Sequence, residues 1–122
     1  MAAYAWASPN TCLGIAIGWF LGGKFEIVDG VVEIHGERVA HTLNRLWLPA
    51  LAITIGHCVL GQSPRALEQT RAHERVHVRQ YERWGPLFIP AYFAAWCYLS
   101  ARGRDGYRNN PFEVEAYRDE KP

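Results

Sequence analysis

The chain has 122 residues, with 13 Lys and Arg against 12 Asp and Glu and a formal net charge of +1. This length suits one domain, so we expect residues 1–122 to share a single core. The balanced charge offers no basic surface for nucleic acid, so we expect no nucleic-acid partner. Three cysteines without C-x-x-C spacing indicate neither a disulfide framework nor a thiolate metal site, and they favour a reducing, cytoplasmic compartment.

The N-terminal part of the chain suggests a scaffold. Residues 11–22 are apolar but short and glycine-rich, without a preceding positive charge, which makes them a poor signal peptide. Residues 24–28 and 31–35 are two β-prone runs joined by Asp29-Gly30, a dipeptide typical of two-residue hairpin turns. We therefore expect a β-hairpin in this region.

Residues 51–60 predict a further strand. They are rich in β-branched side chains and are bounded by Pro49 and Gly61. Together with the hairpin, this strand would complete a small antiparallel sheet.

A helix is predicted next. Residues 71–84 contain no Gly or Pro and repeat apolar side chains at near-helical spacing, and Gly85-Pro86 predicts the end. The start has two interpretations. Either Ser63-Pro64 supplies the cap and the first helical residue, or Thr70 caps a shorter helix.

Both interpretations keep residues 73–77, which read H-E-x-x-H, inside the helix. Residues four apart lie on one helix face, so His73 and His77 can bind one metal ion. Glu74 can then take a proton from a water molecule that the metal activates. We therefore expect a zinc hydrolase with Zn²⁺ as its cofactor. The alternative is an amphipathic helix whose two histidines share a face by chance.

Residues 86–100 form the second long apolar stretch. The stretch is shorter than the roughly 20 residues of a membrane span, and Pro90 interrupts it. We expect a core helix behind the metal site. Contact with a membrane surface through residues 86–100 is the alternative, because five Trp and six Tyr exceed what one small core needs. That alternative requires the segment to be exposed.

A catalytic zinc usually has three protein ligands, so one must come from elsewhere in the chain. Asn110 and then Pro111 open a second helix that carries Glu113 and Glu115. These glutamates lie about 200° apart around a helix and cannot both face one ion. We favour Glu113, which shares its face with the small Ala116. The alternative is that Glu113 completes a capping box and Glu115 is the ligand.

These motifs together resemble the small gluzincin-type zinc metallopeptidases. The resemblance rests on H-E-x-x-H, on Gln80 three residues later and on the downstream N-P-x-E-x-E-A segment, and it covers about residues 50–118. It implies a compact α+β, zincin-like domain with a C-terminal ligand helix. The positions that match the zinc ligands are His73, His77 and Glu113. The position that matches the general base is Glu74. The chain departs from the pattern at Tyr117, where many gluzincins carry an aspartate that orients a zinc histidine.

In zincins of this kind, the strand before the motif helix is an edge that binds peptide substrate through main-chain hydrogen bonds. The resemblance therefore implies a peptide or protein substrate along residues 51–60, with Gly56 allowing close approach of its backbone. His57 either polarises the scissile carbonyl or stabilises the oxyanion, or else it is a half-buried structural side chain. The predicted function is zinc-dependent peptide hydrolysis. The rival is a non-catalytic interaction module, either zinc-stabilised or metal-free. A third interpretation is a membrane-peripheral binding protein.

Overall fold

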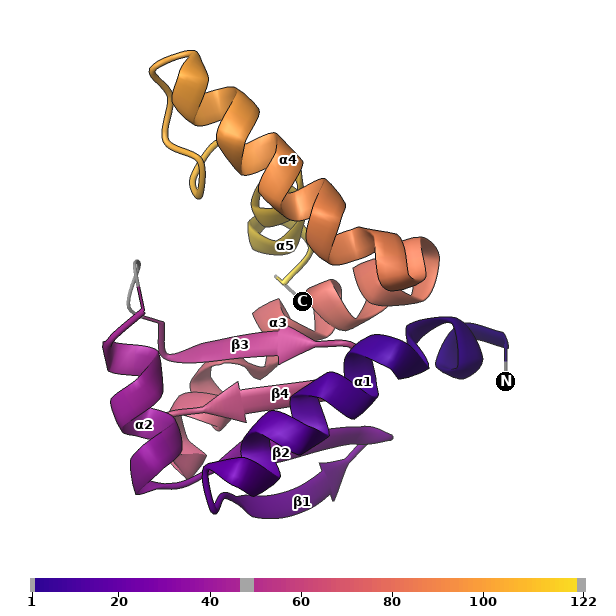
Figure 1. Ribbon diagram of the computed structural model, residues 1–122, viewed down its shortest axis with the longest axis vertical. Coiled ribbons are helices and arrows are strands. Elements are labelled where there is room, and N and C mark those ends of the chain that lie inside the picture. The colour runs from indigo at the N-terminus through magenta and orange to yellow at the C-terminus, as the bar shows by residue number, and fades with distance from the viewer. Residues whose placement is uncertain (1, 47–49, 121–122) are drawn as a thin grey trace.

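The computed structural model describes residues 2–46 and 50–120, and these form the expected α+β fold (Figure 1). In chain order the elements are α1 (Ala2–Phe20), β1 (Lys24–Val28), β2 (Val31–His35), α2 (Glu37–Asn44), β3 (Ala52–Ile55), β4 (Cys58–Gly61), α3 (Pro64–Trp84), the short 3₁₀ helix η1 (Gly85–Leu87), α4 (Phe88–Ala101) and α5 (Pro111–Asp119).

The four strands form one sheet in the order β1-β2-β4-β3. β1 and β2 make the predicted hairpin, and both turn residues have positive φ, 52° at Asp29 and 79° at Gly30, as a type I′ turn requires. β2 pairs with β4 in parallel, whereas β3 and β4 are antiparallel. The sheet is therefore mixed, and the expectation of an antiparallel sheet is wrong.

The segment predicted as one strand over residues 51–60 is two strands, β3 and β4. Gly56 adopts a φ of 67°, which favours glycine, and the chain reverses there so that Ile55 pairs with Cys58. A ten-residue strand exceeds the usual five or six residues, and folding it in two lets both halves join the sheet. Pro49, expected to precede this segment, lies outside the described residues.

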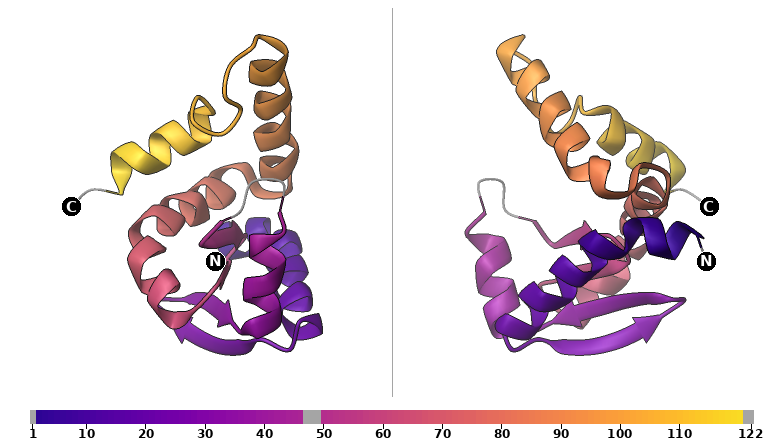
Figure 2. Two further views of the ribbon diagram at one scale, coloured as in Figure 1. Left: turned by 90° about the vertical axis from the view of Figure 1, so that its left-hand side faces the viewer. Right: turned by 45° about the vertical axis from the view of Figure 1, so that its right-hand side comes forward.

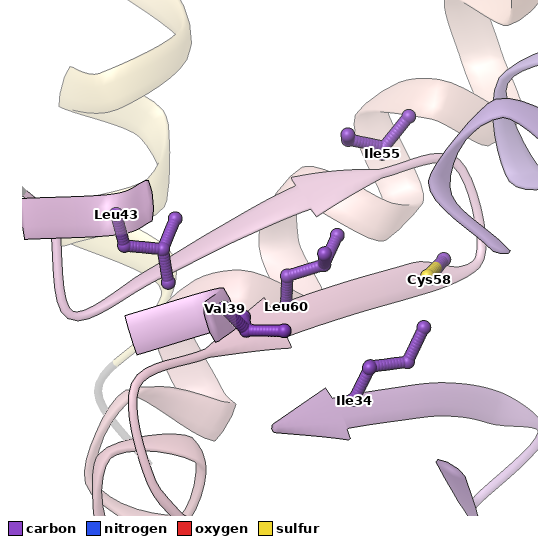
Figure 3. Close-up of a cluster of buried hydrophobic side chains, with 6 residues drawn as sticks. All are labelled: Ile34, Val39, Leu43, Ile55, Cys58 and Leu60. Carbon is purple, nitrogen blue, oxygen red and sulfur yellow. The ribbon is translucent and has the colours of Figure 1, made fainter. Parts of the chain in front are cut away.

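Helices cover both faces of the sheet, with α1 and α2 on one side and α3 on the other (Figures 1 and 2). The first core cluster lies under α2 (Figure 3) and consists of Ile34, Val39, Leu43, Ile55, Cys58 and Leu60. The second lies under α3 and consists of Val31, Ala52, Val59, Leu67 and Val78. Because β4 is buried on both faces, the sheet forms a rigid base for α3.

The C-terminal elements extend from this base. α4 projects away from the sheet, and α5 returns toward α3 (Figure 2). Tyr81, Phe88, Tyr92 and Phe112 form an aromatic cluster that joins α3, α4 and α5. Phe88 is the one α4 residue that is buried, so the expectation that residues 86–100 form a core helix is wrong.

Candidate metal centre

α3 presents the H-E-x-x-H residues because its ends are well defined. Ser63 caps the helix, with its Oγ accepting a hydrogen bond from the Ala66 amide at 3.0 Å, and Pro64 follows as first residue. The longer of the two predicted helices is therefore the one that forms. His73, Glu74 and His77 are all buried around the middle of α3, the helix that α5 contacts.

α5 brings the third candidate ligand to the two histidines. Asn110 caps this helix, its Oδ1 accepting a hydrogen bond from the Phe112 amide at 3.1 Å. The carboxylate of Glu113 does not close a capping box. Its Oε1 lies 3.1 Å from Nε2 of His73 and 3.2 Å from Nε2 of His77.

Three donor atoms thus converge from two helices. In a tetrahedral zinc site, bonds of about 2.0–2.1 Å to nitrogen and oxygen separate neighbouring ligand atoms by roughly 3.3 Å. The distances from Glu113 to the two imidazoles match that separation. The donor chemistry of His73, His77 and Glu113 and these two separations therefore suit a zinc ion.

Glu74 lies beside this group and is held by the sheet. Ligand atoms of His73, Glu74 and His77 lie within 4.8 Å of one another. The hydroxyl of Thr54, on β3, donates a hydrogen bond of 2.8 Å to Oε1 of Glu74. Burial raises the pKa of this carboxyl above its ordinary value, against the lowering effect of the nearby histidines and of the Thr54 hydrogen bond.

The charges of the cluster are strongly coupled. Burial alone would lower the pKa of His73 and His77, but the hydrogen bonds and charge of Glu113 outweigh it and raise both. Burial raises the pKa of Glu113, yet its hydrogen bonds with the two rings lower it to about 2. This cluster of one carboxylate and two imidazoles is therefore suited to a cation that replaces the protons shared between them.

Further residues hold two of the candidate ligands, Glu113 and His77, in place. Tyr92, on α4, donates a 2.7 Å hydrogen bond to Oε2 of Glu113, which leaves Oε1 directed at the histidines. Nδ1 of His77 lies 2.8 Å from Oε1 of Gln80. Gln80 also donates hydrogen bonds to α5, at the Phe112 carbonyl and the Glu115 carboxylate. Glu115 therefore contacts the site only through Gln80.

Two residues that the sequence pattern did not identify lie beside His73. Its Nδ1 has no hydrogen bond among the described residues, but Oε1 of Glu120 lies 3.6 Å away. The ring of Tyr117 packs against the imidazole at a centroid distance of 4.4 Å. Where the resemblance leads one to expect an aspartate, the chain thus has a tyrosine at 117 and a carboxylate three residues later. The sequence gives little indication that Tyr117 and Glu120 lie beside His73, because their positions depend on where α5 ends.

His57 is not part of the cluster. It lies in the turn between β3 and β4, and its Nε2 is 2.8 Å from Oε2 of Glu82. Glu82 follows His73 by nine residues, about 180° around α3, so it lies on the opposite face of the helix. The expectation that His57 acts on a scissile carbonyl at the metal centre is therefore wrong, and its structural interpretation agrees with its burial.

β3 is the edge strand beside α3. Its pairing with β4 shows which of its backbone amides and carbonyls point away from the sheet. The Leu51 carbonyl accepts a hydrogen bond from the Gln62 amide, so Ile53 and Ile55 also face β4. Ala52 and Thr54 therefore face the open edge. The Thr54 carbonyl already accepts a hydrogen bond of 2.9 Å from the Tyr81 hydroxyl.

Gly56 does not provide space for a substrate backbone at the edge of β3. A Cβ atom there would lie 2.5 Å from the backbone nitrogen and the hydroxyl of Thr11 on α1, so α1 occupies the space expected for substrate. The assigned role of Gly56 in substrate approach is wrong.

Comparisons of the chain with models of protein families, with curated proteins and with solved structures found no match.

Proposed function

We propose that the chain is a zinc-dependent peptidase in which Glu74 is the general base. The observation that carries this proposal is the convergence of His73 and His77 on one oxygen of Glu113, with Glu74 beside them. Two imidazoles and one carboxylate are a ligand set of catalytic zinc sites, which leave a coordination position for water. Zinc bound here would polarise a carbonyl and acidify a water molecule.

Glu74 is suited to receive the proton of that water. Its carboxyl is buried, and burial raises its pKa above the ordinary value, which makes the carboxylate a stronger base. The Thr54 hydroxyl holds one carboxylate oxygen and leaves the other to accept the proton. The same carboxyl then delivers the proton to the leaving amine of the peptide.

We further propose that an extended peptide substrate lies along the open edge of β3. The groups that face this edge are the amide and carbonyl of Ala52 and the amide of Thr54, since Tyr81 already binds the Thr54 carbonyl. Thr54 also binds Glu74, so a peptide paired with this strand would run close to the proposed base. For the compartment we propose the cytoplasm, because Cys12, Cys58 and Cys97 are all free thiols.

The decisive experiment combines metal analysis with a peptide-library assay on the wild type and two variants. Glu74→Gln keeps size and hydrogen bonding but cannot accept a proton, so we expect full zinc content and a loss of hydrolysis of about 100-fold or more. The matched control is Glu68→Gln, an exposed glutamate on the same helix, which should behave as wild type.

The possible results separate the hypotheses. Equal cleavage by Glu74→Gln and wild type would refute the general-base assignment. One zinc per chain without cleavage of any library peptide would favour the non-catalytic, zinc-stabilised module. A chain that is purified without chelators, contains no zinc and gains no thermal stability from added Zn²⁺ would eliminate the metal centre itself.

A further inference from the structure

The outer face of α4 is apolar except for Ser100 near its end. The exposed residues recur every three or four positions from the end of η1 to the end of α4, which places them on one side of the helix. They are Leu87, Pro90, Phe93, Ala94, Cys97, Tyr98, Ser100 and Ala101, of which Ser100 alone is polar. No charged residue occurs between positions 86 and 101. A surface helix of a globular protein normally carries its polar residues on this face.

The exposure of this face is imposed by contacts on the other side of the helix. Phe88 and Tyr92 pack against Phe112 of α5, and the Tyr92 hydroxyl binds Glu113. A Cβ atom on Gly106 would lie 2.8 Å from the Trp96 ring, so the loop after α4 packs closely against the inner face of that helix. With these contacts in place, α4 cannot rotate to bury Phe93 and Tyr98, which are 58% and 62% exposed.

Positive charge follows directly after the apolar face. Arg102, Arg104 and Arg108 are all exposed in the loop between α4 and α5. Asp105 is the one acidic residue of that loop, and its carboxylate accepts hydrogen bonds from two backbone amides of the loop itself. The Arg102 guanidinium lies 5.7 Å from the centre of the Tyr98 ring, so cationic and aromatic groups meet at the end of the helix.

We propose that the outer face of α4 docks on the surface of an anionic lipid bilayer. An apolar face with an aromatic residue and arginines at its border matches the boundary between acyl chains and phosphate headgroups. The helix would lie in the plane of the interface, since no helix among residues 2–46 and 50–120 has the length and apolar character needed to cross a bilayer. A second copy of the chain is a poorer match, because its own loop would bring three further arginines and only one acidic residue, Asp105, whose carboxylate already binds loop amides.

This proposal does not depend on zinc or catalysis, and its test is a vesicle co-sedimentation assay with the full chain. One set of vesicles is phosphatidylcholine alone, and the other adds phosphatidylglycerol at about three parts in ten. We expect the wild type to sediment with the anionic vesicles and to be released progressively by salt. Absence of binding to the anionic vesicles would overturn the proposal.

Variants locate the docking face. Phe93→Asp should weaken binding about tenfold or more, and Leu87→Asp provides a second disruption at the other end of the face. The matched control is Ile27→Asp, because Ile27 is 75% exposed on β1, away from α4. It should bind as the wild type does. Equal losses in Ile27→Asp and Phe93→Asp would show that exposed apolar area in general, and not α4, causes binding.

A second pair of variants tests the charge. Arg102→Gln combined with Arg104→Gln should remove most of the preference for anionic vesicles, whereas Arg38→Gln combined with Arg65→Gln should leave it unchanged. Equal binding of the wild type to both kinds of vesicle would overturn the anionic part of the proposal. A self-association that Phe93→Asp abolishes, without any vesicle binding, would show that the face joins two copies of the chain.

Discussion

The Nδ1 atom of His77 lies 2.8 Å from Oε1 of Gln80. An amide oxygen only accepts hydrogen bonds, so Nδ1 of His77 carries the hydrogen and Nε2 is the atom available to a metal. The Nε2 atom of Gln80 is bound in turn to α5, at the Phe112 carbonyl and at Glu115. One side chain thus orients a candidate ligand on α3 and ties it to the helix that carries Glu113.

Removing this contact should weaken metal binding. Replacement of the partner that orients a ligating histidine typically costs 10–100-fold in affinity, so we expect a loss of about that size for Gln80→Leu. Competition with a chromophoric chelator measures the affinity for Zn²⁺. Gln69→Leu, at an exposed position on α3, is the control and should match the wild type. Unchanged affinity in Gln80→Leu would show that Gln80 only packs the helices.

The two glutamates of α5 should differ sharply in their effect on zinc affinity. Glu113 contacts both imidazoles directly, so Glu113→Ala should lower the affinity by several orders of magnitude. Glu115 acts only through Gln80, and Glu115→Ala should cost about tenfold at most. The same chelator competition measures both. The reverse ranking would mean that α5 is rotated relative to the register described above.

Glu120 should support His73. Its Oε1 lies 3.6 Å from Nδ1 of that ring, a gap that a small shift on metal binding can close into a hydrogen bond. We expect Glu120→Ala to lower zinc affinity about tenfold. The neighbouring Asp119 is the control, because its carboxylate binds Arg118 and not the histidine. If both variants lose affinity equally, the effect comes from the end of α5 and not from Glu120.

Local signals explain which parts of the fold could be predicted from the sequence. Asp29-Gly30 determines its turn through two positive φ angles, and Ser63-Pro64 and Asn110-Pro111 cap their helices through contacts within three residues. These features depend on neighbours in the chain. The hairpin and the start of α5 were therefore correctly predicted, and the start of α3 is one of the two predicted alternatives.

Features that depend on distant residues were missed. The parallel pairing of β2 with β4 joins segments that are far apart in the sequence, and the Gly56 turn is stabilised by Thr11 of α1, whose hydroxyl binds the His57 amide. Glu82, the partner of His57, follows it by 25 residues. The helical spacing of H-E-x-x-H placed two histidines on one face, but periodicity alone could not place Tyr92 or Glu120 beside them.

A buried carboxylate links the sheet to the helix that carries the candidate site. Glu33, on β2, is 3% exposed and accepts two hydrogen bonds from Arg71 and one from Arg75, all between 2.9 and 3.0 Å. Glu33→Gln would leave these arginines without their counter-charge. Because the Arg71 side chain is 36% exposed and can regain water, we expect a loss of about 2 kcal/mol, below the usual cost of breaking a buried pair.

Chemical denaturation of the metal-free protein measures this loss. Glu26→Gln is the matched control, since Glu26 pairs with Glu33 across the hairpin but is exposed. That variant should be neutral or slightly stabilising, because it removes a like charge opposite Glu33. Equal stability of the two variants would show that the arginines do not depend on Glu33.

The metal-free and zinc-bound chains should respond to pH in opposite directions. In the metal-free chain the pKa values of His73 and His77 are raised, so their contribution to stability is complete below about 6.5 and is lost as pH rises through the folded-state values. Zinc requires unprotonated rings, so its affinity increases over the same rise in pH. Glu113, with a pKa of about 2, remains ionised throughout and does not contribute to either trend.

Melting temperatures between about pH 5.5 and 8.5, with a chelator or with excess Zn²⁺, measure both trends. With chelator the contribution of the two rings should make the melting temperature decline as pH rises, and with zinc the stabilisation relative to chelator should grow. His41→Gln, at an exposed position on α2, should leave both curves unchanged. Parallel curves for the two conditions would mean that protons and zinc do not compete for His73 and His77, which contradicts the geometry of the site.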